Sequence, residues 1–334
     1  MDMRQLRYFV QIVESGSLAK ASQLLFVSQP SLSQQLAKLE DEIGRKLLNR
    51  SSRGVWPTSY GDALYKHAIF LLRQFNQTKA IARQEDSQIN GQVCLGLAPT
   101  TLGALGLRLL ERVRSRYPGI LLNVIEGMSG HLEQLARAGQ FDIAVLFRQL
   151  PAIELVAEPL LDEKLYVIAP AGRCSRIPAE VQALSLREVA ELPLILPTAA
   201  HGLRRRLAME FEHCGVPLQP VAEIDSLSLL MNCVERDIGL SIQPVSALFA
   251  RPAASHGWRC LDISDHPIVR VNYLYSQPPE KLSPAAHAVR EQLRDLVRGL
   301  VAEGTWSGVV LHEGSEAPQA LVPAAPDTFP GDPP

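Results

Sequence analysis

The chain has 334 residues, of which 46% are hydrophobic and 20% are charged, a composition typical of soluble globular proteins. Its length allows two or three domains, and no apolar run reaches the roughly 18 residues that a transmembrane helix needs. The N-terminus lacks the features of a signal peptide, so we expect a cytoplasmic protein without membrane contact. The net charge of −2 is uneven, because residues 1–90 carry +4 and the remainder carries −6. The N-terminal region is therefore where a polyanion such as DNA would bind.

Two short helices joined by a tight turn are expected within residues 17–38, after a first helix over about residues 3–15. Pro30 suits the first turn of the second short helix, where a missing N–H costs nothing. One face of this helix is apolar and carries Leu32, Leu36, Leu39 and Ile43. The opposite face is small and polar and carries Pro30, Ser31, Ser33, Gln34, Ala37 and Lys38. Such a face suits a helix that enters a DNA groove, and an ordinary helical hairpin with a solvated face is the alternative.

A short β-wing is indicated by the pattern of residues 47–59. Gly54 supplies its turn, and Arg50 and Arg53 lie near its tip. Arginines at such a tip commonly hold phosphates or enter the minor groove, and a solvated turn is the alternative. Thr58 can cap the long helix that follows.

The long helix is expected to run from Thr58 to about Ser87. Its apolar and small residues alternate at spacings of four and three, at Leu64, Ala68, Leu71, Phe75, Thr78 and Ala82. This is a heptad seam, which suits contact with another helix. Such a stripe should be too long for its own small domain to cover. Pairing of two chains and packing against the C-terminal part of the same chain are the two interpretations.

After a polar hinge at residues 84–92, apolar strands alternate with helices. We expect strands at residues 93–98, 121–126, 142–147, 164–169, 192–197, 221–224, 239–242 and 269–275, and helices near residues 103–117, 131–138, 203–214, 226–236 and 283–300. This alternation indicates an α/β fold with mostly parallel sheets. Residues 304–334 are rich in Pro, Ala and Gly without periodicity, and a disordered tail is expected there.

Polar side chains follow several of the expected strands, at the edge where open α/β sheets bind ligands. Thr100 and Thr101 lie between a strand and a helix, Ser129 stands before a helix, Thr198 follows a strand, and Phe147 and Gln243 lie where two more strands end. A hydroxyl at a helix N-terminus can bind a carboxylate or another anion. Helix capping alone is the alternative for these hydroxyls.

Signatures of catalysis and of cofactor binding are missing from the sequence. The glycines near residue 100 do not have the G-x-G-x-x-G spacing, and neither a P-loop lysine nor a G-x-S-x-G motif is present. The five cysteines show no C-x-x-C spacing, so we expect no metal, no cofactor and no disulfide. We therefore expect a protein that is not an enzyme.

The segment from Ala21 to Gly61 resembles the winged helix-turn-helix of LysR-type transcriptional regulators. The matching positions are Ala21, Leu24, Ser28, Gln29, Pro30, Ser33, Leu39, Glu40, Gly44, Leu47, Arg50, Thr58 and Gly61. The segment departs from the family where Leu48 replaces a usual Phe and Pro57 replaces a usual apolar residue. The resemblance extends more loosely to about residue 300, and residues 97–120 look most like the nitrogen-assimilation control branch.

This resemblance implies an N-terminal all-α winged helix-turn-helix, a long linker helix and a two-lobed α/β effector domain that resembles periplasmic binding proteins. The family uses the linker helix to pair two subunits. The expected bounds are 1–58 for the DNA-binding domain, 59–89 for the linker helix, 90–303 for the effector domain and 304–334 for the tail. Within the effector domain, lobe one is expected at 92–162 plus 267–300 and lobe two at 163–266.

The implied function is a ligand-responsive transcription regulator that reads a palindromic promoter through the helix at 29–43, as a homodimer or homotetramer. Its expected contacts with double-stranded DNA are Gln29, Pro30, Ser31, Ser33, Gln34, Lys38, Arg50, Arg53 and Thr58. Its small-molecule effector, by preference a carboxylate, is expected to contact Thr100, Thr101, Ser129, Phe147, Thr198 and Gln243. A two-lobed solute-binding protein and an enzyme that uses the cleft are the alternatives. The basic N-terminal region counts against the first, and no catalytic constellation supports the second.

Overall fold

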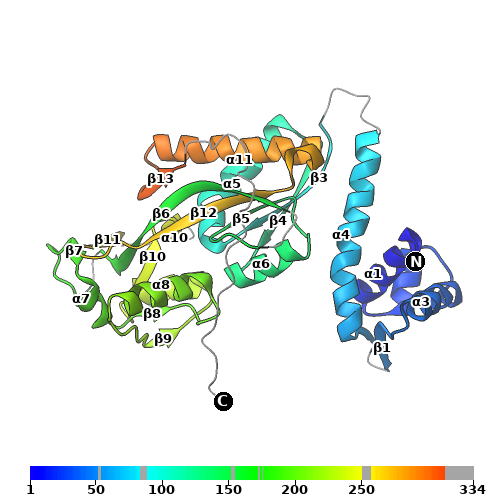
Figure 1. Cartoon of the computed structure of the whole chain (residues 1–334), viewed down its shortest axis with the longest axis horizontal. Coiled ribbons are helices and arrows are strands. Elements are labelled where there is room, and N and C mark those ends of the chain that lie inside the picture. Colours follow the sequence, from blue (N-terminus) through cyan, green and yellow to red (C-terminus); the bar gives the residue numbers. More distant parts are fainter. Residues whose placement is uncertain are drawn as a thin grey trace, which may run out of the picture.

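The computed structural model describes residues 1–51, 54–82, 89–151, 155–171, 174, 176–249 and 257–312. A small, mostly helical N-terminal domain, one long helix and a larger α/β part follow one another along the chain (Figure 1). None of the helices in these ranges is long and apolar enough to cross a membrane.

The N-terminal domain packs three helices against a short hairpin. Its elements are α1 (Met3–Ser15), α2 (Leu18–Leu24), α3 (Gln29–Ile43), β1 (Leu48–Ser51) and β2 (Gly54–Pro57). The side chains of Asp2, Ser17 and Ser28 cap the three helices. The core draws apolar residues from the helices and from the chain at the start of the hairpin: Phe9, Ile12, Ala21, Leu32, Leu36, Leu39, Leu47 and Leu48. The expected helix-turn-helix and wing are therefore present.

The long helix α4 (Ser59–Ala82) packs along α1 where it leaves the N-terminal domain (Figure 1). Leu64 and Ala68, the first two residues of the predicted seam, pack against α1, and Ala68 is fully buried. The expectation that the small domain cannot cover this stripe is therefore wrong for its first part. Leu71, the next seam residue, is 36% exposed and remains accessible to a second chain.

Lobe one of the α/β part is a mixed sheet with helices on both faces. In this sheet β3 (Gly91–Leu97) is parallel to β4 (Ile120–Glu126) and β5 (Ile143–Leu146), and β12 (Val269–Ser276) is antiparallel to β5. Alternate residues of β3 face opposite sides of the sheet. Val93 and Leu95 pack against α5 (Pro99–Arg116) and α11 (Pro284–Ala302), and Cys94 packs with α6 (Ser129–Arg137). A single 3₁₀ turn, Pro279–Lys281, lies between β12 and α11.

Lobe two has its own apolar cores and shorter elements. Its strands are β7 (Ala183–Leu184), β8 (Ile195–Leu196), β9 (Ala222–Glu223), β10 (Ser241–Pro244) and β11 (Trp258–Ile263). Its helices are α7 (Leu186–Ala190), α8 (Gly202–His213), α9 (Leu227–Glu235) and α10 (Ser246–Phe249). The sequence analysis missed β7, β11, α7 and α10, since most of these elements are too short to show a periodicity.

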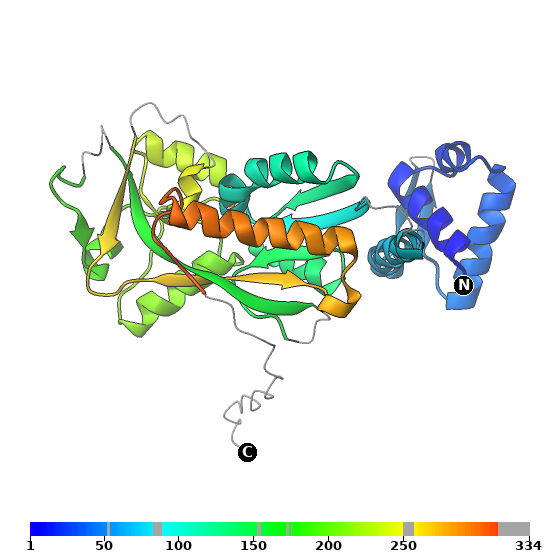
Figure 2. The ribbon, with the colours of Figure 1, turned by 90° about the horizontal axis from the view of Figure 1, so that it is seen from above.

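Two long antiparallel strands, β6 (Val156–Pro170) and β12, join the lobes. β6 pairs with β12 from Val156 to Lys164, and its second half pairs with β10 and β11 of lobe two. Figures 1 and 2 show β6 and β12 side by side along the α/β part. The expected two-lobed α/β fold is therefore present, with a cleft between the lobes. The expectation of mostly parallel sheets is wrong, because the long strand β6 pairs antiparallel with β10, β11, β12 and the C-terminal strand Val309–Leu311.

The prediction of a disordered tail from residue 304 is wrong for residues 304–312. β13 (Val309–Leu311) pairs with β6, and Trp306 is only 1% exposed. The strand pairing and the buried indole give this segment interactions that its composition does not reveal. Residues 313–334 lie outside the described residues.

Candidate functional site

The exposed face of α3 carries the residues expected to read DNA. Ser28 caps this helix by accepting the N–H of Ser31 at 3.4 Å, and Gly44 ends it in the left-handed conformation at φ 71°. Buried leucines anchor the opposite face. Gln29, Pro30, Ser31, Gln34, Ala37 and Lys38 are exposed, and Ser33 is half-buried. The helix thus presents small donors and acceptors of the kind that fit a major groove.

Glu40 ties this helix to the wing, a role that the sequence analysis did not assign. Its side chain is 5% exposed, and its carboxylate accepts hydrogen bonds from the N–H groups of Leu47 (2.9 Å) and Leu48 (3.3 Å) and from Lys46 Nζ (2.7 Å). Burial alone would raise the pKa of Glu40, but these hydrogen bonds outweigh burial and lower the pKa. An acidic residue directly after Leu39 of the apolar stripe was the available signal.

The three remaining predicted DNA contacts, Arg50, Arg53 and Thr58, lie on the wing or beside it. Arg50 is exposed on β1, whereas Arg53 lies outside the described residues. The Thr58 hydroxyl donates to the carbonyl of Lys46 at 2.7 Å and accepts the N–H of Gly61 at 3.1 Å. Thr58 therefore supports the base of the wing and caps α4, and its hydroxyl is already used within the domain.

A buried arginine, Arg270 of β12, lies at the centre of the interlobe cleft and was not predicted. It is 6% exposed, and it donates to the carboxylate of Glu163 on β6 from Nε (2.9 Å) and Nη2 (2.7 Å). Nη2 also donates to Thr100 Oγ1 at 2.9 Å, and the guanidinium carbon lies 3.9 Å from the ring centroid of Phe147. These contacts join the crossing strands to the start of α5 and the end of β5.

Arg270 lines two cavities between the lobes. The smaller has a volume of about 30 Å³, which suits a single water, and Thr100, Phe147 and Gln243 also line it. The larger has a volume of about 520 Å³, and its walls include Ser129, Phe147, Arg148, Arg205 and Arg206. Four arginines around a cavity of this size favour a small anionic ligand.

Some of the polar groups around the 520 Å³ cavity have ion-pair or hydrogen-bond partners within the protein, and others do not. Arg148 pairs with Glu133, and Arg206 pairs with Glu210 at 2.6 Å. The exposed Arg205 makes no ion pair with any residue that the structure describes. Ser129 is buried, and its hydroxyl has no hydrogen-bond partner within the described ranges. An unpaired guanidinium and an unpartnered hydroxyl are groups that a carboxylate can satisfy.

His201 lies beside the smaller cavity at the start of α8. Its Nδ1 accepts the N–H of Leu203 at 3.0 Å, so it is the cap of α8. Burial, together with the positive charge of Arg270, lowers the pKa of His201 to about 4. The imidazole is therefore neutral at pH 7, with its proton on Nε2.

Two of the expected effector contacts, Thr198 and Thr101, are not free groups on the walls of these two cavities. Thr198 donates its hydroxyl to Asp225 Oδ2 at 3.0 Å and its N–H to Asp225 Oδ1 at 2.9 Å, and it does not cap α8. Thr101 is 1% exposed and lines neither of the two cavities. Thr198 therefore uses its hydroxyl proton within the protein, whereas the Thr100 hydroxyl accepts from Arg270 and still has its own proton to donate.

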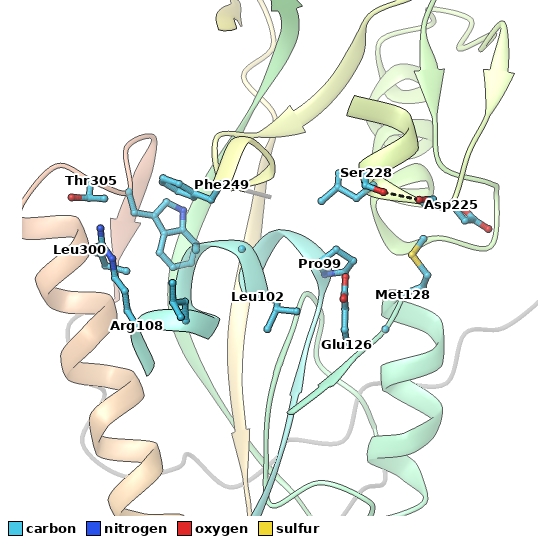
Figure 3. A pocket seen from close by; sticks show the side chains of 17 residues that line it. Pro99, Leu102, Arg108, Glu126, Met128, Asp225, Ser228, Phe249, Leu300 and Thr305 are labelled. Atoms are coloured by element: carbon cyan, nitrogen blue, oxygen red, sulfur yellow. Dashed lines mark hydrogen bonds between the residues drawn. The ribbon is translucent and has the colours of Figure 1, made fainter. Parts of the chain in front are cut away.

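A third cavity, of about 820 Å³, opens between α5 and the start of α9 (Figure 3). Phe249, Leu300 and Thr305 lie at one end, and Met128, Asp225 and Ser228 lie at the other. Leu107, which lines this cavity, is 70% exposed, and the nearby Leu229 of α9 is 51% exposed. Contact with a second protein chain would remove these apolar side chains from water.

Comparison with known proteins identifies both parts of the chain. Residues 3–62 match the family described as bacterial regulatory helix-turn-helix protein, lysR family, and residues 86–298 match the LysR substrate binding domain. The chain is 36% identical over 298 residues to the nitrogen assimilation regulatory protein nac of Klebsiella aerogenes, which covers 89% of this chain and 95% of that protein. It is 31% identical over 305 residues to the protein of the same name in Escherichia coli (strain K12), with coverages of 91% and 97%.

The fold is also shared with a solved full-length structure. Full-length OxyR from Pseudomonas aeruginosa superimposes with a TM-score of 0.69 at 23% identity, over 89% of this chain and 95% of that chain. The two family matches together cover the helix-turn-helix and the two-lobed domain. The chain therefore belongs to the LysR family of DNA-binding transcriptional regulators, which are not enzymes, and it carries the effector-binding domain of that family.

Proposed function

We propose that this regulator is a cytoplasmic homo-oligomer that reads a palindromic promoter through α3 and responds to a small carboxylate bound between its lobes. The observation that carries the proposal is one chain with both an exposed polar face on α3 and a cavity lined by four arginines. Two relatives with more than 30% identity are named nitrogen assimilation regulatory proteins. We extend the proposal to target genes of nitrogen assimilation on that basis.

Binding to the DNA upstream of its own gene tests the first half of the proposal. The full-length protein should retard this DNA in a gel shift and protect two related half-sites from cleavage. Their centres should lie about one helical turn apart or a multiple of it, because two α3 helices related by a two-fold axis must enter successive major grooves. Selection from random DNA that yields a single, unrepeated site would contradict palindromic reading.

The larger interlobe cavity supports a carboxylate as the effector class. The hydroxyl of Ser129 and the guanidinium of Arg205 can both donate to carboxylate oxygens, and neither needs to leave a present partner in the described structure. The Glu163–Arg270 pair can stay intact when such a ligand binds. The ligand regulates only if it binds two lobe arrangements with unequal affinity.

Titration calorimetry of the full-length protein against a panel of small carboxylates tests this site. For the carboxylate that binds, Ser129→Ala and Arg205→Ala should each weaken binding by about 10- to 100-fold, since each removes a hydrogen bond to a charged group. Arg187→Ala is the matched control, because Arg187 is equally exposed but lies on α7 outside the cavity. Equal affinity in all four proteins would place the ligand elsewhere.

Two apolar surfaces support the homo-oligomer. One is the accessible part of the α4 seam at Leu71, and the other is the face of α5 and α9 that carries Leu107 and Leu229. Two separate surfaces allow a dimer or a tetramer. Leu71→Asp and Leu107→Asp should each lower the mass in sedimentation, because each would bury a charge in an interface. A variant that sediments like the wild type excludes its surface as an interface.

A further inference from the structure

The last described residues of the chain form a strap over the crossing strand β6. We define the strap as residues 304–312, which follow Glu303, the C-cap of α11. The carbonyl of Gly308 accepts the N–H of Lys164 at 2.8 Å, and β13 pairs antiparallel with residues 161–163 of β6. The N–H of His312 donates to the carbonyl of Leu160 at 3.1 Å. The strap therefore lies along β6 where this strand passes from one lobe to the other (Figure 1).

Trp306 anchors the strap in the apolar core of lobe one. Its side chain is 1% exposed, and its Nε1–H donates to Glu163 Oε1 at 3.1 Å. Gly308 turns the chain at φ +71°, and a Cβ at this position would lie 2.7 Å from the hydroxyl of Tyr166 on β6. Only glycine fits this turn without displacing the strap or Tyr166.

Glu163 is the point at which the strap meets the interlobe cleft. Its fully buried carboxylate accepts hydrogen bonds from Arg270 and Asn272 of β12, the latter at 3.4 Å. It also accepts from Ser246 of α10 at 2.5 Å and from Trp306 of the strap. Oε1 accepts from Ser246 and Trp306, and Oε2 accepts from Arg270 and Asn272. Since a carboxylate offers only about four lone-pair directions, the donors together fix its orientation.

We propose that the strap is a latch that holds the two lobes in their present arrangement, with Trp306 as a positioning residue for Arg270. The contacts run from Trp306 to Glu163, from Glu163 to Arg270, and from Arg270 to Thr100 at the start of α5. Ser246 brings α10 to the same carboxylate, and this helix packs against α5 of lobe one and, through Ala247, in an apolar core of lobe two. Hydrogen bonds to a buried charge are strong and directional, so loss of the indole donor leaves Oε1 with Ser246 alone and weakens the positioning of the carboxylate and of the guanidinium bonded to it.

Hydrogen–deuterium exchange of the full-length protein tests the latch. Trp306→Phe keeps an aromatic ring in the core and removes the N–H donor. Gly308→Ala displaces the strap through its contact with Tyr166 and its positive φ. Val310→Ala is the matched control, since Val310 lies on β13 but is 69% exposed.

We expect the amides at the cleft edges, residues 100–102 and 198–203, to exchange about tenfold faster in Trp306→Phe and Gly308→Ala, and at the wild-type rate in Val310→Ala. The amides of Lys164 and His312 report separately on the strap, because both take part in its bonds to β6. Faster exchange at Lys164 and His312 with unchanged cleft edges in Gly308→Ala would overturn the latch. Unchanged cleft edges in Trp306→Phe would overturn the role of Trp306. A uniform increase of the exchange rates over both lobes would also overturn the role of Trp306, since a general loss of stability would then explain the result.

Discussion

The reading helix and the interlobe cleft use polar side chains in opposite ways. On α3, Gln34 and Lys38 are exposed, and buried leucines on the opposite face, together with the buried Glu40, hold the helix in place. At the centre of the cleft, Arg270 and Glu163 are almost fully buried and are bonded to each other. Polar groups on α3 are therefore available to another molecule, whereas those at the cleft centre contribute to stability. Substitutions should separate the two regions, because they should affect binding in the first and folding in the second.

The largest effect is expected from Arg270→Met. This change leaves the Glu163 carboxylate buried without its cation, which should lower the free energy of unfolding by about 3–5 kcal/mol. The double variant Glu163→Gln with Arg270→Met should recover most of this loss, because no buried charge remains. Gln34→Ala should change the same free energy by less than about 0.5 kcal/mol. Urea unfolding checks all three, and a stable Arg270→Met protein would show that Glu163 can reach solvent.

Glu40 lies on α3, but its substitution should affect folding as well as binding. Glu40→Ala should have the next largest effect on the free energy of unfolding. It leaves the N–H groups of Leu47 and Leu48 without their buried acceptor, which should cost about 2–3 kcal/mol and detach the wing from α3. Asp41→Ala is the matched control, because Asp41 is exposed on the same helix. Thermal unfolding together with a gel shift measures both consequences. If both variants behave alike, Glu40 does not organise the wing.

His201 makes the cleft sensitive to acid. Its pKa is about 4 in the folded protein and about 6.5 when unfolded, so the unfolded chain binds the proton first as the pH falls. The neutral imidazole makes its full contribution to the free energy of unfolding at pH 7. This contribution should decrease by about 1–2 kcal/mol between pH 7 and pH 5. His201→Asn can still cap α8 but cannot titrate, so its stability should fall less over this range. Urea unfolding at several pH values should show this difference, and parallel curves for the two proteins would contradict it.

The smallest effect is expected on the wing. Arg50→Ala removes one exposed cation, and it should weaken binding to all DNA sequences alike while lowering the salt slope of log K by about 0.9. Lys66→Ala removes the same charge from α4, where Lys66 pairs with Asp62 at 2.7 Å, and it should leave the slope unchanged. Gel shifts at several salt concentrations measure the slopes. A change of sequence preference in Arg50→Ala would mean that the wing reads bases.

The reading helix could be predicted because its determinants are local. The stripe of Leu32, Leu36 and Leu39 lies within a few turns, and Pro30 marks the helix start. The cleft centre could not be predicted in this way, since Glu163 and Arg270 are 107 residues apart in sequence. Both lie inside strands, whereas the sequence predicts ligand contacts where strands end.

Contacts with residues distant in the sequence explain two further differences between prediction and structure. Thr198 stands where a cap or a ligand contact was expected, but Asp225 takes both its N–H and its hydroxyl. Trp306 lies among glycines and small residues, so local composition favours disorder there. Its burial depends on the core of lobe one and on Glu163, which the sequence does not place beside it.

Selection of binding sites from random DNA with the wild type and with Gln34→Ala tests whether α3 reads bases. The exposed Gln34 amide can pair with adenine through two hydrogen bonds, so its loss should remove the base preference at one position. In a homo-oligomer this position should recur symmetrically in both half-sites, with a cost of about 1–3 kcal/mol at that base pair and unchanged protein stability. An identical set of selected sites for the two proteins would contradict the assignment of this face of α3 to the bases.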